Sequence, residues 1–244
     1  YEIELELNNN YKYELMDVTK LLQVIRKSIR TVLSGLQDTP YPIPYSEIDR
    51  IYDDYKQLIH GKNVNLDVWK RNSGDFIGPQ SVTLQQEHLR IDSTFNILED
   101  YMVTEKADGE RSLLYVSTKG KIYMIKQNMK IVFTGTFTKN EDCFNSILDG
   151  EFLMTGKHNK KLFLYAAFDI YYIGSRKEPN VRSLNFYNNH EIEADTSFRL
   201  SLLQKFVELL KPQSVVQNNT QSCIFNVKVK EFLAGENNNI FNAC

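Results

Sequence analysis

The run from Lys106 to Arg111, Lys-Ala-Asp-Gly-Glu-Arg, places a lysine, an aspartate, a glycine and an arginine at close spacing. A lysine amine can attack the α-phosphate of a nucleoside triphosphate, which forms a phosphoramidate and releases pyrophosphate. The amine must be neutral to attack, and a cation such as Arg111 or a divalent metal ion favours the neutral form. Asp-Gly is also a common β-hairpin turn, so the run alone is equally compatible with a charged turn. We take Lys106 as the candidate nucleophile.

Two motifs further along the chain could hold the rest of a nucleotide. Glu151 ends an Asp-Gly-Glu triplet, and its carboxylate could accept hydrogen bonds from a ribose diol or ligate Mg²⁺. Phe168, next to Asp169 near the end of an apolar run, could stack on a base. Such stacking tolerates any base, so it does not choose guanine over adenine. Read alone, the triplet would be a surface turn and Phe168 a core residue.

A third group of acidic residues lies at the amino-terminal end. Glu2, Glu4 and Glu6 alternate with Ile3, Leu5 and Leu7, and this period of two predicts a strand with three carboxylates on one face. Hard oxygen ligands suit Mg²⁺ or Mn²⁺. A solvated edge strand is the alternative interpretation.

Composition limits the class of protein. The chain has 244 residues and a net charge of −2, which argues against a protein that coats nucleic acid and suits contact with a small RNA end through a local patch. Cys143, Cys223 and Cys244 have no disulfide or zinc spacing, so we expect a reducing compartment. We expect no membrane span and no signal peptide. Both ends fall inside predicted elements, so we expect a segment of a longer protein.

Two helices are expected before these motifs. Apolar residues at helical spacing predict a long amphipathic helix from Leu15 to Leu36, and a second helix from Ser46, its expected N-cap, to Leu58. The proline-rich connector 39–44 cannot be helical. From about Lys70 the pattern changes to short strands, which predicts an α+β fold with antiparallel sheets and flanking helices. The expected strands span 101–105, 112–117, 122–126, 131–133, 147–153, 162–170 and 225–229, with a further helix at 198–210.

Taken in order, the lysine run, the Asp-Gly-Glu triplet and the Phe-Asp pair resemble the covalent nucleotidyltransferases, which comprise mRNA-capping guanylyltransferases and ATP-dependent DNA and RNA ligases. The resemblance implies an ATP-grasp-like, ligase-type nucleotidyltransferase fold in which Lys106 carries the nucleotide. It further implies that Arg111 contacts the ribose and helps to hold the lysine loop. Glu151 would bind the ribose hydroxyls or a metal ion, Phe168 would stack on the purine, and Asp169 would lie on the metal side.

The segment from Phe76 to Leu84 favours one branch of this family. It is similar to the Phe-Pro-Gly-x-Gln-Pro-Val-Ser segment of capping guanylyltransferases, and Gln80, Val82 and Thr83 align with it as further nucleotide-binding residues. Proline is missing at positions 77 and 81, so the match is partial. The resemblance implies a GTP substrate, a Mg²⁺ or Mn²⁺ ion, and transfer of GMP through lysyl-GMP to the 5′-diphosphate end of RNA.

The acidic strand resembles the Glu-x-Glu strands of metal-dependent RNA triphosphatases, which precede the guanylyltransferase in some viral capping enzymes. We therefore expect a multifunctional enzyme of the large DNA virus type, with further capping domains or a methyltransferase in the same polypeptide, located in the virion or host cytoplasm. The expected division is a triphosphatase-type strand at 1–7, a helical linker region at 8–70 and a guanylyltransferase domain at 71–244.

We expect that domain to be incomplete at its carboxyl end. The family's Asp/Glu-Gly-hydrophobic strand, its later lysine-rich strand and its OB-fold domain are not recognised before Cys244. Two alternatives stay open at this point. One is the adenylylation domain of an ATP-dependent DNA or RNA ligase, and the other is a non-catalytic scaffold that binds a partner through the helices at 15–60.

Overall fold

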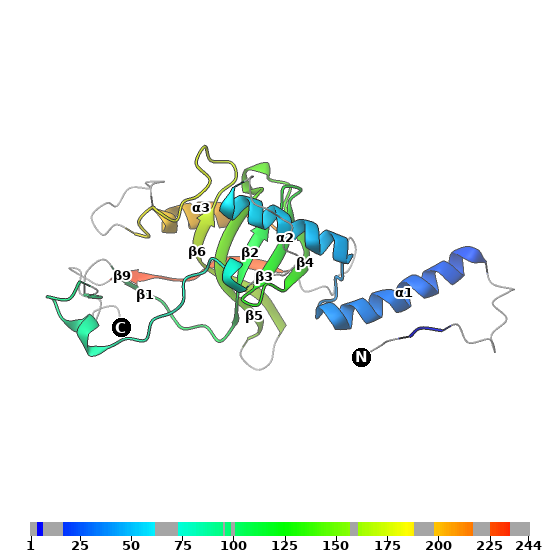
Figure 1. Cartoon of the computed structure of the whole chain (residues 1–244), viewed down its shortest axis with the longest axis horizontal. Coiled ribbons are helices and arrows are strands. Elements are labelled where there is room, and N and C mark those ends of the chain that lie inside the picture. Colours follow the sequence, from blue (N-terminus) through cyan, green and yellow to red (C-terminus); the bar gives the residue numbers. More distant parts are fainter. Residues whose placement is uncertain are drawn as a thin grey trace.

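The fold is mixed α+β, built on one curled, mostly antiparallel sheet (Figure 1). The computed structural model describes residues 4–6, 17–61, 73–94, 96–98, 101–156, 161–187, 198–216 and 225–234. Within these ranges the seven-stranded sheet has the order β7-β4-β3-β2-β5-β6-β8, and β1 pairs with β9 in a separate two-stranded sheet. The strands are β1 (Met102–Val103), β2 (Glu110–Val116), β3 (Lys121–Lys126), β4 (Ile131–Phe137), β5 (Ser146–Thr155), β6 (Lys161–Tyr172), β7 (Gln213–Ser214), β8 (Asn226–Val229) and β9 (Leu233–Ala234).

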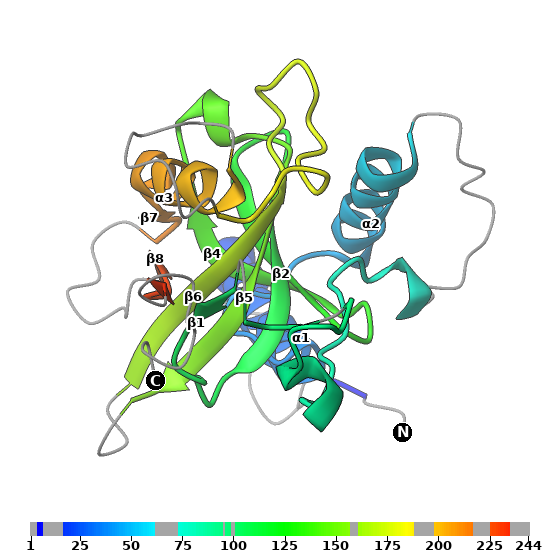
Figure 2. The ribbon, with the colours of Figure 1, turned by 90° about the vertical axis from the view of Figure 1, so that its left-hand side faces the viewer.

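Both faces of the sheet are covered, which explains why its strands read as nearly continuous apolar runs. Helix α3 (Arg199–Leu210) packs on one face, where Leu203 and Phe206 meet the side chains of strands such as β2 and β5. Helix α2 (Tyr45–His60) packs on the other face through Ile51 and Tyr55. Figure 2 shows the two helices on opposite sides of the sheet.

Helix α2 is part of this domain, so the expected linker 8–70 is wrong for its residues. Beyond its apolar stripe, Glu47 accepts hydrogen bonds from Lys121 Nζ and Tyr123 Oη of β3, both at 2.7 Å. The N-cap prediction is also wrong, because the helix begins at Tyr45 after Pro44 and Ser46 lies inside its first turn.

Helix α1 (Val18–Gln37) has a different environment. It projects away from the sheet (Figure 1), and of its residues, all of which the structure describes, only Gln37 is buried. The Gln37 amide bonds the connector in both directions: Nε2 donates to Ile43 O at 2.7 Å and Oε1 accepts from Ile43 N at 3.0 Å. The expected role of helix α1 as part of a linker stays a prediction.

None of the helices in the described ranges is long and apolar enough to cross a membrane.

Several strands differ from the sequence-based expectation. Strand β4 was expected to end at Phe133 but runs to Phe137, because a bulge accommodates Thr134 and Gly135. Gly135 has a φ of +74°, and the Tyr41 ring lies where a Cβ at this position would be. Strand β8 pairs with β6 in parallel, so the sheet is not wholly antiparallel. Residues 4–6 form no strand, which is contrary to the expected acidic strand, and the exposed Glu4 and Glu6 lie there. Glu2 falls outside the described residues.

Candidate nucleotide site

An ion pair between Arg111 of β2 and Asp149 of β5 forms the floor of the site. Arg111 Nη2 and Nε donate to the two Asp149 oxygens at 2.6 and 3.2 Å, and Tyr171 Oη donates to Asp149 Oδ2 at 2.7 Å. The Asp149 side chain is 0% exposed. Burial disfavours the charge on Arg111, but the hydrogen bond and ion pair with Asp149 outweigh it and raise the pKa of Arg111. The pair is therefore braced by hydrogen bonds from both Arg111 and Tyr171.

This pairing changes one expectation about Arg111. The guanidinium charge is balanced by a fully buried carboxylate, so Arg111 is not the uncompensated cation that we expected to favour a neutral Lys106 amine. Its contacts support the other expected role, which is to hold neighbouring segments in place. Sequence reasoning quoted Asp149 only as the first residue of its triplet and gave Tyr171 no role.

The segment 76–80 closes over this ion pair. The Arg111 guanidinium lies 5.7 Å from the centre of the Phe76 ring, and Arg111 Nη1 donates to Pro79 O at 2.7 Å. Gly78 is buried between them, and a Cβ there would come within 2.8 Å of Arg111 Nη2 and 3.0 Å of Asp149 Oδ2. The glycine that aligns with the capping segment is therefore required by close approach to the ion pair.

The residues that follow on this segment are open to solvent. Gln80, Val82 and Thr83 are exposed, and Val82 reaches 81%. Their assignment to nucleotide binding stays a prediction, because the structure places them at the rim of the site and not against its floor.

A second lysine, Lys230, lies in the site and was missed by sequence reasoning. It follows β8, its backbone N–H donates to Ala167 O at 2.8 Å, and its Nζ lies 5.9 Å from the centre of the Phe168 ring and 3.7 Å from Glu151 Oε2. The expected strand at 225–229 is β8, and Lys230 follows it directly; that the family's later lysine-rich strand lies beyond Cys244 stays a prediction. The alternation Val-Lys-Val-Lys at 227–230 was the available signal, since period two puts Lys228 and Lys230 on one face.

Phe168 lies between the two cationic groups. Arg111 is 5.6 Å and Lys230 5.9 Å from its ring centre, and the ring is only half-buried. Both distances are in the range of favourable cation–π contacts. The structure thus brings Arg111, Glu151 and Phe168 together as predicted, on β2, β5 and β6.

The loop that carries Lys106 joins this floor to the Lys230 strand. On one side, Gly109 fits against β5, where an added Cβ would lie 3.1 Å from Glu151 Cβ and 3.0 Å from Phe152 O. On the other side, Thr104 Oγ1 donates to Glu231 O at 2.7 Å, and β1 pairs with β9 just beyond. Lys106 itself is exposed. Its loop therefore lies against β5 at one end and is bonded at the other end to the backbone next to Lys230.

Asp169, which was expected on the metal side of the site, is bound by an arginine. Its Oδ1 accepts from Arg199 Nε at 2.8 Å and from Ile170 N at 2.8 Å, and its Oδ2 accepts from Arg199 Nη2 at 3.1 Å. Burial raises the pKa of Asp169, although Arg199 opposes this. Asp169 therefore anchors helix α3, and its role on the metal side stays a prediction.

Glu151 is the carboxylate of the site that fits a divalent metal ion. Its Oε2 is buried and has no hydrogen-bond partner among the described residues, and Lys230 is 3.7 Å away. Mg²⁺ is commonly held by one or two carboxylates together with substrate phosphates, so a single protein carboxylate is compatible with it. In the part of the chain that the structure describes, no cluster of three potential metal ligands occurs. A Glu2–Glu4–Glu6 site stays untested, because Glu2 lies outside that part.

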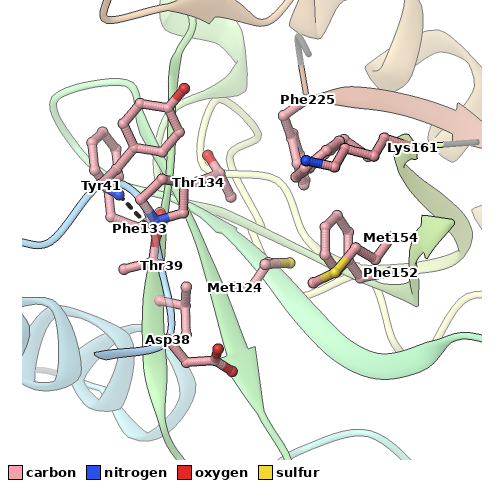
Figure 3. A pocket seen from close by; sticks show the side chains of 13 residues that line it. Asp38, Thr39, Tyr41, Met124, Phe133, Thr134, Phe152, Met154, Lys161 and Phe225 are labelled. Carbon is pink, nitrogen blue, oxygen red and sulfur yellow. Dashed lines mark hydrogen bonds between the residues drawn. The ribbon is translucent and has the colours of Figure 1, made fainter. Parts of the chain in front are cut away.

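A separate cavity of about 310 Å³ contains none of the predicted site residues (Figure 3). The α1–α2 connector supplies Asp38, Thr39 and Tyr41 on one side, and Phe225 and Lys161 lie on the other. Phe152 also lines it, and since neighbouring strand residues point to opposite faces, this cavity and Glu151 are on opposite sides of β5.

A braced ion pair, a half-buried aromatic ring, a second lysine and a clamped lysine loop are features expected of a nucleotide-transferring domain. A family model described as mRNA capping enzyme, catalytic domain, matches residues 48–242, and the chain therefore belongs to that family. The chain is also similar to the "Probable mRNA-capping enzyme" of Acanthamoeba polyphaga mimivirus, with 27% identity over 165 residues, which is 66% of this chain and 12% of the relative. The predicted membership of the capping enzymes is confirmed, and the match begins within helix α2.

Proposed function

We propose that this chain is the guanylyltransferase part of an mRNA-capping enzyme, with an ATP-grasp-like, ligase-type nucleotidyltransferase fold. It transfers GMP from GTP, through a Lys106–GMP intermediate, to the 5′-diphosphate end of RNA. The observation that carries the proposal is the attachment of the Lys106 loop, through Gly109 to the Glu151 strand and through Thr104 to the backbone beside Lys230. Family membership supports GTP and RNA as the substrates.

The first step makes one bond and breaks one. Lys106 Nζ, in its neutral form, attacks the α-phosphorus of GTP, so that an N–P bond forms while the bond from that phosphorus to the bridging oxygen breaks and pyrophosphate leaves. The amine gives up a proton as the phosphoramidate forms. In the second step a terminal phosphate oxygen of the RNA attacks the same phosphorus, and the N–P bond breaks with return of a proton to Lys106.

The neighbouring residues divide the binding of GTP between them. Phe168 offers a half-buried ring for the guanine base, and stacking of this kind contributes roughly 1–3 kcal/mol. Lys230 supplies positive charge beside that ring for the phosphates. Glu151 has an unsatisfied buried oxygen for a ribose hydroxyl or for a divalent ion, which when bound would neutralise phosphate charge.

The test is covalent labelling with radioactive GTP in the absence of RNA. Wild type should form an acid-labile adduct, and Lys106→Ala should form none. Lys119→Ala is the matched control, since Lys119 is also an exposed lysine at a turn of the sheet, and it should label like wild type. Labelling with ATP and not with GTP would instead identify a ligase adenylylation domain, and labelling of Lys106→Ala would refute the nucleophile.

The whole protein's other activities are a further proposal. The chain spans 12% of the length of the mimivirus relative, which leaves room in such a polypeptide for the other capping domains and for a methyltransferase. We propose that these accompany the guanylyltransferase in a virus-type capping enzyme that acts in the virion or host cytoplasm. The finding of separate genes for these activities in the source genome would contradict this.

A further inference from the structure

Side chains of helix α2 converge on Asp75, which ends a short 3₁₀ helix just before the site segment 76–80. Tyr52 Oη donates to Asp75 Oδ2, and Tyr55 Oη donates to the Asp75 backbone oxygen at 2.6 Å. Two nitrogen groups approach the same carboxylate: Lys56 Nζ lies 3.9 Å from Oδ2, and His60 Nε2 lies 3.6 Å from Oδ1. One helix thus holds one carboxylate from several sides.

The donors in this cluster are themselves fixed. The Tyr52 and Tyr55 rings are 7% and 0% exposed and belong to the core between α2 and the sheet, together with residues such as Ile51. A close-packed ring of this kind cannot move without disturbing its neighbours. Asp75 is therefore attached to the rigid sheet through two tyrosines, and its side chain is only 14% exposed.

The residues directly after Asp75 form the wall of the nucleotide site. Phe76 is one residue on and lies over the Arg111 guanidinium, and Ile77 packs on the same core as α2. Gly78 and Pro79 then contact Arg111, with the Pro79 carbonyl accepting its hydrogen bond at 2.7 Å. An extended residue spans about 3.3 Å, so only a short length of chain separates Asp75 from residues 76–80. A fixed Asp75 therefore sets the position of this whole segment.

We propose that Asp75 is a positioning residue for nucleotide binding, and that α2 acts through it to hold segment 76–80 against the Arg111–Asp149 pair. This inference rests on the proposed guanylyltransferase function. Asp75 touches neither Arg111 nor the Lys106 loop in any contact that the structure gives, so its effect reaches the nucleotide through the segment. Loss of Asp75 weakens the hold on GTP, while the reactive lysine and its loop stay in place.

Kinetics of lysyl-GMP formation test this inference in the full chain. Asp75→Ala should raise the KM for GTP roughly tenfold, since hydrogen bonds to a charged group are lost, and should leave the rate at saturating GTP within about twofold. Asp75→Asn keeps acceptors for Tyr52 and should recover most of the affinity. Asp54→Ala is the matched control, because Asp54 makes a different α2 ion pair, with Arg50 at 3.7 Å, and should leave KM unchanged.

Two results would overturn the inference. One is an unchanged KM for GTP in folded Asp75→Ala. The other is a rate at saturating GTP that falls by the same factor in Asp75→Ala and Asp75→Asn, because an equal loss of rate in both variants is the pattern of a general structural defect. If Asp75→Ala does not fold, Tyr52→Phe removes only the donor hydroxyl from the cluster and should raise KM in the same direction by a smaller factor. An unchanged KM in Tyr52→Phe would then count against the inference.

Hydrogen exchange separates this inference from the proposed function. In Asp75→Ala the amides of residues 76–80 should exchange faster, while those of β2 and β5 keep their protection. A wild-type chain that labels with no nucleotide would refute the proposed function alone, because the exchange result does not depend on labelling. Unchanged exchange across 76–80 would refute the positioning role of Asp75 whatever the labelling shows.

Discussion

Two aspartates stand opposite each other in the sheet, and each is paired with an arginine. Asp149 of β5 and Asp169 of β6 are register partners across a bulge. Asp149 binds Arg111, and Asp169 binds Arg199 at the start of α3. By residue type and pairing the two are alike, yet one lies at the centre of the nucleotide site and the other attaches a helix.

The surroundings of the two pairs make the difference. Arg111 has the Phe76 and Phe168 rings and a single carbonyl, Pro79 O, besides its aspartate. Arg199 also donates to the carbonyls of Leu184 and Arg182, which belong to a connecting loop. Arg199 also lies 5.6 Å from the centre of the Phe186 ring. The difference is that the Phe168 ring beside Arg111 also has Lys230 next to it, while Arg199 is bonded to loop carbonyls. An ion pair becomes part of a site through what else its arginine touches.

Removal of the first carboxylate should have the largest effect. Asp149→Ala leaves the Arg111 charge buried among rings and leaves the Tyr171 hydroxyl without its acceptor, so we expect a loss of about 3–5 kcal/mol in the free energy of unfolding. Urea denaturation measures this loss, and GTP labelling should disappear with it. A variant with unchanged stability would show that the buried pair contributes little to this fold.

Removal of the second carboxylate should cost less. In Asp169→Ala the Arg199 guanidinium keeps its two carbonyl acceptors, so we expect a loss of about 1.5–3 kcal/mol in the same urea experiment. The KM for GTP should stay close to wild type, because both Asp169 oxygens are bound by Arg199. A large rise in KM, with stability hardly changed, would show that Asp169 takes part in nucleotide binding and that the two pairs do not differ in this respect.

The smallest expected effect is a pH dependence that belongs to Asp169. Burial raises its pKa above the usual 3.8, against the opposing effect of Arg199. The folded state then binds the proton more tightly than the unfolded chain does, so this contribution to stability is complete below 3.8 and is lost as pH rises through the folded pKa. The unfolding free energy of wild type should therefore fall relative to Asp169→Asn across this window. The opposite slope would mean that Arg199 lowers the pKa.

Much of the site was readable from local sequence because the chemistry is concentrated in short runs. Lys106 and Arg111 lie within six residues of each other, and Glu151 and Phe168 each stand in a recognisable small motif. The strands that carry them were predicted because their apolar character is strong and their turns contain glycine. The sequence did not show that Arg199, thirty residues away, would bind both oxygens of Asp169.

Other features depended on contacts between distant parts of the chain. Lys230 reaches the site only because β8 pairs in parallel with β6, and the expected linker helix α2 is a wall of the domain because its apolar stripe matches the outer face of the sheet. Asp75 was not singled out by any motif, and its importance follows from the α2 side chains that meet it.

By itself, the sequence determined the order of the motifs and the family, and it supplied Lys106 as the proposed nucleophile, because these reside in residue types at fixed short spacings along the chain. Tertiary structure decided that Asp149 pairs with Arg111 and Asp169 with Arg199, and that Lys230 lies beside Glu151 and Phe168. Those choices depend on strand register and on the packing of helices against the sheet, and both are set by the burial of apolar side chains far apart in sequence.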